Sequence, residues 1–387
     1  MNSENKPPEG KKKEYRTIHP GLKGVYLDNS KICYINGDEG KLYYRGYSIE
    51  DLVEHSSFEE VVFLLIYGYL PSRYELFTLR NTLIAERELP DRVLMILKSF
   101  PRETTRIELL RTAISALSLF DPEDYNYSTD ANIRKGIRII AKIPTILAYA
   151  HRIKSNLPII EPHEELSHAG NFYYMMVGHE PDAETEKAFD KGLILQSEHS
   201  SNASTFAARV TVSTLSDIYS AITSAIGALR GPLHGGANER VMMMLKEIGT
   251  PDHAEAYVME KLNRKERIMG IGHRVYRTID PRAVIFKKLA EEFCRKAGNE
   301  HLIEICDTIV DVMKREKNLS PNVDFYSAPF LYSVKVPVLL YTPLFAASRS
   351  AGWVAHTIEQ LENNTLIRPL MVYKGDINRK YVPIDER

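Results

Sequence analysis

Two histidines stand in glycine-rich stretches, and a histidine in such a place can exchange or donate a proton at a bound ligand. His234 lies in "GPLHGGANE" (231–239), and His273 lies in "MGIGHRVYRTIDPR" (269–282). Glycine leaves room for a ligand beside the backbone, and proline fixes the direction in which the chain enters a loop. The pattern indicates a ligand at each histidine, although a tight turn that contains a histidine would have the same composition.

Several other charged or polar residues stand outside helical periodicity. Asp324 in "NVDFYS" lies between apolar residues, where a carboxylate can act as a general base. His199 lies in "EHSSNAS", and each of these residues alone fits a structural role such as a helix cap or a core histidine. The forked guanidinium of arginine suits carboxylates and phosphates, and the candidates are Arg277, Arg282, Arg349 and Arg368. Together they indicate an enzyme that uses a carboxylate base on an anionic substrate.

The composition excludes several other classes of protein. The sequence has no HExxH, no zinc-type His/Cys spacing, no GxGxxG after a strand and no GxxxxGK[ST], which disfavours metal, dinucleotide and P-loop sites. The net charge of −1 gives no basic surplus for nucleic acid. Three distant cysteines, a charged start without an apolar stretch and no apolar run long enough to span a membrane favour a cytoplasmic protein.

The elements that must position these residues are mostly helices. Capping signals occur as "SIED" (48–51), "SFEE" (57–60), "SRYE" (72–75) and "TRIE" (105–108). Apolar periodicity predicts further helices over 91–100, 131–153, 184–209, 214–229 and 281–297. Strand-like alternation is confined to 23–45, where "NGDEG" predicts a turn. The expected class is mostly α with a small β element near the N-terminus, and 387 residues suggest two or three domains.

The ordered set of motifs resembles the citrate synthase family. "GPLHGGAN", "MGIGHRVYRTIDPRA" and "VDFYS" are similar to the three catalytic blocks of that family. "INGDEGKLYYRGYSIEDL", "EHSSNASTFAARV" and "AGWVAHTIEQ" extend the resemblance over nearly the whole chain. The resemblance implies a two-domain helical homodimer that condenses oxaloacetate with acetyl-CoA to give citrate and free CoA, with no permanently bound cofactor or metal.

The resemblance also implies how the chain is divided. A large domain would comprise residues 1–234 and 330–387, the latter ending in a C-terminal arm, and a small domain would comprise 235–329. The small domain would close over oxaloacetate before acetyl-CoA binds, which limits wasteful hydrolysis of the thioester.

The site residues carry over onto matching positions. Asp324 would remove a proton from the acetyl methyl group, His234 would donate to the enolate oxygen, and His273 would polarise the ketone of oxaloacetate. Oxaloacetate would be bound by His199, Arg282 and Arg349, and by Arg368 of the partner subunit. CoA would be bound by Arg277 and by the backbone of Ile268, Met269, Gly270, Ile271 and Gly272.

The sequence departs from the family pattern at some positions and is compatible with more than one function. Ala328 and Pro329 stand where the family usually has glycine, and Leu370 stands where many relatives have a second arginine. A 2-methylcitrate synthase would use propionyl-CoA on the same fold, since one methylene in a pocket is worth only about 1–3 kcal/mol. A further alternative, less favoured than these, is a metal-dependent hydrolase with His199, His234 and His273 as ligands. A helical scaffold without activity is disfavoured, because His234, His273 and Asp324 are all present.

Overall fold

Helices form most of the protein. The computed structural model describes residues 17–387, and the chain divides into the units Met1–Ser30 and Lys31–Arg387. In the first unit, the described residues include one 3-10 turn, η1 (Pro20–Leu22). The described part of the second unit contains sixteen α-helices and one three-stranded sheet. The predicted class, mostly α with a small β element near the N-terminus, is therefore confirmed.

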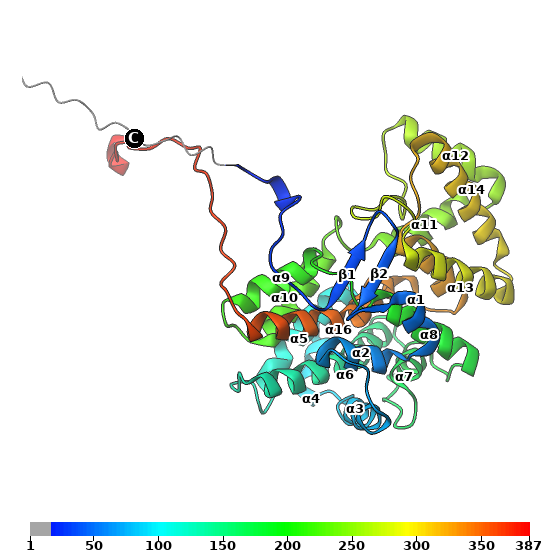
Figure 1. Cartoon of the computed structure of the whole chain (residues 1–387), viewed down its shortest axis with the longest axis horizontal. Coiled ribbons are helices and arrows are strands. Elements are labelled where there is room, and N and C mark those ends of the chain that lie inside the picture. The colour runs from blue at the N-terminus through cyan, green and yellow to red at the C-terminus, as the bar shows by residue number, and fades with distance from the viewer. Residues whose placement is uncertain (1–16) are drawn as a thin grey trace, which may run out of the picture. The chain divides into compact units, whose positions relative to one another are not determined.

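The second unit is shown in Figure 1 with its elements labelled. Its strands are β1 (Cys33–Asn36), β2 (Lys41–Tyr44) and β3 (Tyr47–Ser48). Its first helices are α1 (Ile49–His55), α2 (Phe58–Tyr67), α3 (Arg73–Ala85), α4 (Asp91–Ser99), α5 (Arg106–Leu117), α6 (Thr129–Lys154), α7 (His168–Val177) and α8 (Ala183–Gln196). They are followed by α9 (Ala203–Ser213), α10 (Ile218–Arg230), α11 (Ala237–Ile248), α12 (Pro251–Asn263), α13 (Pro281–Ala297), α14 (Glu300–Lys317), α15 (Val323–Ser333) and α16 (Tyr341–Glu362). Short 3-10 turns are η2 (Ser118–Phe120), η3 (Val338–Leu340) and η4 (Ile384–Glu386).

The predicted helix starts are formed by local hydrogen bonds. Reciprocal capping boxes join Ser57 to Glu60 at α2, Ser72 to Glu75 at α3 and Thr105 to Glu108 at α5. At α1 the Ser48 hydroxyl oxygen accepts the N–H of Asp51 at 3.1 Å. These contacts involve residues only three apart, so the sequence was sufficient to predict them.

The helix predicted over 184–209 is two helices with a loop between them. α8 ends at Gln196 and α9 begins at Ala203, because Ser200 adopts a left-handed φ of 53° and Asn202 caps α9. The Asn202 carboxamide oxygen accepts the N–H groups of Ser204 and Thr205, each at 3.1 Å. The apolar periodicity continues across the break because both helices bury one face, and the break places His199 in a loop.

The β element is smaller than the predicted region 23–45. β1 and β2 form an antiparallel hairpin in which Cys33 pairs with Tyr44, and β3 adds the third strand. The predicted "NGDEG" turn joins β1 to β2. Its residue Gly37 accepts the N–H of Arg277 on its carbonyl oxygen at 2.9 Å, so the turn contacts the segment that follows His273.

The helix α16 forms the centre of the structure. It is buried along nearly its whole length and packs against α2, α5, α6, α8, α9, α10 and α11. Figure 1 shows α16 running between α9 and α10 on one side and α2, α5 and α6 on the other, while α11 to α14 gather at the right of the view. Within residues 235–329, α11 to α15 pack mainly on one another, and α15 continues to Ser333.

The thiols of Cys33, Cys294 and Cys306 are all free. Within residues 17–387, none of the helices has the combination of length and apolar character that crossing a membrane requires.

Candidate active site

The glycine-rich stretch before His273 is joined to the segment that begins α15. The N–H of Gly272 donates to the Ser320 carbonyl oxygen at 2.8 Å, and the N–H of Asn322 donates to the Gly270 carbonyl oxygen at 2.9 Å. Gly270 has a φ of 74°, and a Cβ at this position would lie 3.0 Å from the Cα of Phe325. Glycine is therefore required here, and these contacts hold the two segments in one register.

Asp324 lies in the first turn of α15 with its side chain partly buried. Asn322 caps this helix and accepts the N–H of Asp324 at 3.0 Å. No donor within residues 17–387 makes a hydrogen bond to the Asp324 carboxylate. Burial raises the pKa of Asp324 to about 6, while the charges of Arg282 and Arg349 oppose that rise. Such a carboxylate is mostly ionised at pH 7 and is a stronger base than an exposed one.

The imidazole of His273 is held by its own loop. Its Nδ1 accepts the N–H of Val275 at 2.9 Å and the N–H of Tyr276 at 3.1 Å. Because backbone N–H groups only donate, the proton of the neutral ring lies on Nε2. Nε2 is 3.9 Å from the nearer carboxylate oxygen of Asp280, beyond hydrogen-bond distance. Burial, and then the charge of Arg282, lower the pKa of His273 to about 4.

The imidazole of His234, in the turn between α10 and α11, is held by a residue of α9. Its Nε2 accepts the N–H of Ser204, in α9, at 3.2 Å and lies 2.8 Å from the hydroxyl oxygen of that serine. The proton of the neutral ring therefore lies on Nδ1. Burial, and then the charge of Arg349, lower the pKa of His234 to about 4. The neighbouring Gly235 packs so closely on the Leu229 carbonyl group that a Cβ would collide with it.

His199 is buried at the centre of the loop between α8 and α9. Its ring lies edge-on to that of His273 with centroids 5.3 Å apart, and its Nε2 is 3.3 Å from the hydroxyl oxygen of Tyr276. Burial, and then the charges of Arg282 and His273, lower the pKa of His199 well below its usual range. His199 and His273 therefore face each other as uncharged rings.

Arg282 is buried and paired. Its Nε donates to one carboxylate oxygen of Asp280 at 3.0 Å, and its Nη2 donates to the other at 2.8 Å. The same carboxylate caps α13 by accepting the N–H of Arg282 at 3.0 Å. The charge of Asp280 raises the pKa of Arg282 despite the opposing effect of burial.

Arg349 is buried in α16 without a carboxylate partner. Its Nε donates to the carbonyl oxygen of Gln196 at 2.7 Å, and its guanidinium carbon lies 4.6 Å from the ring centre of Phe345. Within residues 17–387 no acidic side chain forms an ion pair with it, and burial lowers its pKa. The charge of Glu198 opposes this fall in pKa without forming an ion pair with Arg349. A buried cation is costly unless anions compensate it, so this position suits an anionic ligand.

The two buried arginines act on the same set of ionisable groups. The charge of Arg282 lowers the pKa of His199 and of His273, and the charge of Arg349 lowers the pKa of His199 and of His234. Both charges also oppose the rise that burial causes in the pKa of Asp324. The structure therefore brings six of the predicted residues into one electrostatic environment: His199, His234, His273, Arg282, Asp324 and Arg349.

Two predicted residues lie outside this cluster. The Arg277 side chain is 83% exposed and forms an ion pair with Asp38 at 3.2 Å. Arg368 is exposed in the segment after α16 and makes no hydrogen bond or ion pair with any described residue. The backbone predicted for CoA, residues 268–272, lies beside the α15 segment that carries Asp324.

Sequence reasoning did not identify several residues that hold the site. Tyr276 bonds His199, and Ser204 bonds His234, although both stand inside the motifs themselves. Asp280 was not among the predicted site residues, and the Asp-Pro-Arg spacing is the one local signal of its pair with Arg282. Among residues 17–387, no group of three or more His, Cys, Asp or Glu side chains is placed to hold a metal ion. The geometry therefore gives no support to the metal-dependent hydrolase.

Comparison with known proteins is consistent with this arrangement. The sequence model described as "Citrate synthase, C-terminal domain" matches residues 21–370. The chain is 47% identical to "Citrate synthase 2" of Bacillus subtilis over 96% of this chain and 100% of that protein. It is 41% identical to "2-methylcitrate synthase 1" of Corynebacterium glutamicum over 96% of this chain and 98% of that protein. A solved ternary complex of a Thermoplasma acidophilum citrate synthase with carboxymethyl coenzyme A and oxaloacetate has a TM-score of 0.92 and 36% identity, with 96% of this chain and 100% of that chain covered.

Proposed function

The chain belongs to the citrate synthase family of acyltransferases, and we propose that it condenses oxaloacetate with acetyl-CoA to give citrate and free CoA. The observation that carries this proposal is the combination of two uncharged imidazoles with one carboxylate of raised pKa. His234 and His273 each carry an N–H donor on the nitrogen opposite the one the backbone holds, and Asp324 is a partly buried base.

The chemical roles follow from these protonation states. Asp324 takes a proton from the methyl group of acetyl-CoA while Nδ1–H of His234 donates to the thioester oxygen. Nε2–H of His273 donates to the ketone oxygen of oxaloacetate. The methylene carbon then attacks the ketone carbon, and the citryl-CoA formed is hydrolysed, which releases citrate and CoA. Uncharged donors stabilise the developing oxyanions without first losing a counter-ion.

The anionic substrate is assigned to the buried cations. Arg349 has no ion pair with a carboxylate of the described residues, and Arg282 has its Nη1 outside the pair with Asp280. The two guanidinium groups therefore suit the two carboxylates of oxaloacetate. His199 supplies a further hydrogen bond. CoA is assigned to Arg277 and to the backbone of 268–272, and an arriving phosphate would replace the exposed contact between Arg277 and Asp38. No cofactor is bound permanently.

The assembly is proposed to be a homodimer. In the segment after α16, Leu370, Met371, Tyr373 and Tyr381 are 69–92% exposed, so this arm buries little of its apolar surface in its own subunit. Its root is held where the N–H of Ile367 donates to the Ser213 hydroxyl oxygen at 3.1 Å. A partner subunit would cover the arm, and Arg368, next to that root, would enter the partner's site.

The division into a large domain of 1–234 and 330–387 and a small domain of 235–329 is part of the same proposal. The packing of α11 to α15 on one another supports it. Arg349 and His199 would then belong to the large domain, and His273 and Asp324 to the small one, so that closure assembles the site around oxaloacetate. A cytoplasmic location completes the proposal.

The test is release of free thiol from acyl-CoA by the purified protein. We expect turnover that needs both oxaloacetate and acetyl-CoA, with kcat/KM for acetyl-CoA above that for propionyl-CoA. Activity without oxaloacetate, or no thiol release with either acyl-CoA, would contradict the proposed function. A strong preference for propionyl-CoA would favour 2-methylcitrate synthase, which the relatives do not favour.

A further inference from the structure

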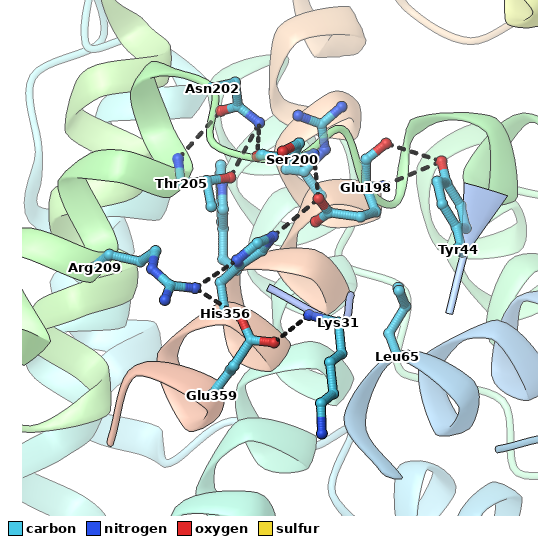
Figure 2. Close-up of polar contacts among 12 residues, drawn as sticks. Lys31, Tyr44, Leu65, Glu198, Ser200, Asn202, Thr205, Arg209, His356 and Glu359 are labelled. Atoms are coloured by element: carbon cyan, nitrogen blue, oxygen red, sulfur yellow. Dashed lines mark hydrogen bonds and ion pairs between the residues drawn. The ribbon is translucent and has the colours of Figure 1, made fainter. Parts of the chain in front are cut away.

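Buried polar groups bind the two residues on either side of His199, Glu198 and Ser200 (Figure 2). The hydroxyl of Tyr44 donates to the Glu198 carbonyl oxygen at 2.9 Å, and this oxygen belongs to the peptide group before His199. The Glu198 carboxylate accepts the N–H of Ser200, which belongs to the peptide group after His199. The two peptide groups that flank His199 are therefore both fixed by hydrogen bonds.

The Glu198 carboxylate is in turn held by α16. Nε2 of His356 lies 3.0 Å from the same Glu198 oxygen that accepts the Ser200 N–H, and both side chains are at least 98% buried. Nη1 of Arg209 donates to Nδ1 of His356 at 3.0 Å, as Figure 2 shows. Because an arginine only donates, the proton of the neutral His356 ring lies on Nε2 and is directed at Glu198.

The chain of contacts continues beyond the loop. Arg209 also donates to Glu359 at 2.9 Å and to Gln360 at 3.0 Å, so two residues of α16 fix its guanidinium. This fixes the direction of the bond that Arg209 makes to His356, and hence the orientation of the ring that reaches Glu198.

The packing leaves the Glu198 carboxylate little room to move from this position. Gly352 of α16 lies so close to Glu198 and to the Ser197 carbonyl oxygen that a Cβ would collide with both. Arg349, Gly352 and His356 recur at helical spacing and lie toward one face of α16. One face of one helix therefore carries Arg349 and holds the loop of His199.

We propose that Glu198 and His356 are positioning residues for the reaction. They hold the His199 loop so that its imidazole and the guanidinium of Arg349 meet the same oxaloacetate molecule. The inference rests on the proposed function, because it takes His199 to contact oxaloacetate. Under this proposal Glu198 and His356 affect the binding of oxaloacetate and not that of acetyl-CoA. Side chains that only stabilised the fold would not affect one substrate selectively.

The test is a double-mutant cycle on the full-length protein. We expect His356→Ala to raise KM for oxaloacetate about tenfold while KM for acetyl-CoA changes less than about twofold. In a His199→Ala background the same substitution is expected to have almost no further effect on KM for oxaloacetate, since residues that act through one group are not additive. Equal effects of His356→Ala in both backgrounds would overturn the proposal.

A matched control separates positioning from stability. His151 is a buried histidine of α6. Among residues 17–387, its Nδ1 has no hydrogen-bond partner and it makes no hydrogen bond to the His199 loop. His151→Ala is expected to lower Tm without changing KM for oxaloacetate. A rise in KM for His151→Ala as large as that for His356→Ala would overturn the proposal.

Conservative variants guard against loss of folding. His356→Gln keeps a donor near Nε2, and Glu198→Gln keeps one acceptor oxygen. Each is expected to recover most of the affinity for oxaloacetate that His356→Ala or Glu198→Ala, respectively, loses. A KM for oxaloacetate as high as that of the alanine variants, in folded glutamine variants, would overturn the proposal.

If wild-type protein is active but His199→Ala leaves KM for oxaloacetate unchanged, the positioning proposal fails alone. If the wild type releases no thiol, the proposed function fails first.

Discussion

The imidazoles of His234 and His273 are both kept uncharged, but the backbone holds a different ring nitrogen in each. Burial lowers the pKa of each imidazole to about 4, yet the backbone holds Nε2 of His234 and Nδ1 of His273. The free N–H is therefore Nδ1–H in one loop and Nε2–H in the other. Backbone donors, which cannot change their role, thus fix the tautomer of each ring without a carboxylate partner.

The two loops differ in where the holding group lies. His273 is held by Val275 and Tyr276 of its own loop, so the ring and its support form one segment. His234 is held by Ser204 of α9, whose hydroxyl also accepts the indole N–H of Trp353 at 3.1 Å. The orientation of His234 therefore depends on packing between helices, while that of His273 depends on a local turn.

The largest effect on kcat should come from replacing Asp324, the base that removes the methyl proton. We expect Asp324→Asn to lower kcat by about 10²–10⁴-fold, because the amide cannot accept the methyl proton. The binding of oxaloacetate should change little, since Arg282 and Arg349 remain. Steady-state kinetics and equilibrium binding of oxaloacetate check the two parts, and unchanged turnover would remove Asp324 from the role of base.

Replacing either donor should separate the two loops. We expect His234→Ala and His273→Ala each to lower kcat about 10²–10³-fold, as loss of one oxyanion donor does. Exchange of the acetyl-CoA methyl hydrogens with solvent, in the presence of a dicarboxylate without a ketone, should be lost in the His234 variant and kept in the His273 variant. The reverse pattern would show that the two histidines have been assigned to the wrong oxygens.

The arm after α16 offers a test of the site across subunits. We expect Arg368→Ala to raise KM for oxaloacetate about 10–100-fold, because a charge-assisted contact to a carboxylate is lost. A mixed dimer of Arg368→Ala and Arg282→Ala subunits should regain one working site. A mixed dimer as inactive as either parent would place Arg368 in its own subunit.

The pH dependence should follow the base and not the histidines. Asp324 must be ionised, and burial raises its pKa to about 6, so kcat/KM should fall about tenfold per pH unit below 6. His234 and His273 are uncharged throughout that range, because burial lowers their pKa to about 4. A kcat/KM that stays level from pH 7 to pH 5 would contradict this assignment.

The smallest effect on kcat should come from the Ser204 hydroxyl, which contacts His234 and has no counterpart at His273. Ser204→Ala keeps the backbone N–H and loses only the hydroxyl, so we expect kcat to fall about 2–5-fold. Ser350→Ala is the matched control and should leave kcat unchanged, because within residues 17–387 the buried Ser350 hydroxyl bonds only to its own helix. An equal loss in both variants would mean that the Ser204 hydroxyl does not support His234.

The helices were predictable where their signals are local. The starts at Ser57, Ser72 and Thr105 depend on residues three apart, and the structure forms all three capping boxes. The stretch "EHSSNAS" was singled out as standing outside helical periodicity, but the helix predicted over 184–209 ran through it, because apolar periodicity does not record a left-handed serine. The helix class and the first turn of each of these helices could therefore be predicted from the sequence, and the bounds of the loop that carries His199 could not.

The site shows the same limit. His234, His273 and Asp324 could be selected because glycine or apolar neighbours mark them in the sequence. Glu198 and His356 are 158 residues apart, and nothing local to either one indicates that they meet. The tautomers of the two histidines could not be predicted either, because they depend on which backbone N–H groups the fold directs at each ring.

The most direct test of the two donor assignments is ¹⁵N NMR of histidine-labelled protein at pH 7, with His234→Gln and His273→Gln used to assign the two rings. We expect two neutral imidazoles of opposite tautomer, protonated on Nδ1 in His234 and on Nε2 in His273. A positively charged ring at either position, or the same tautomer at both, would contradict these assignments.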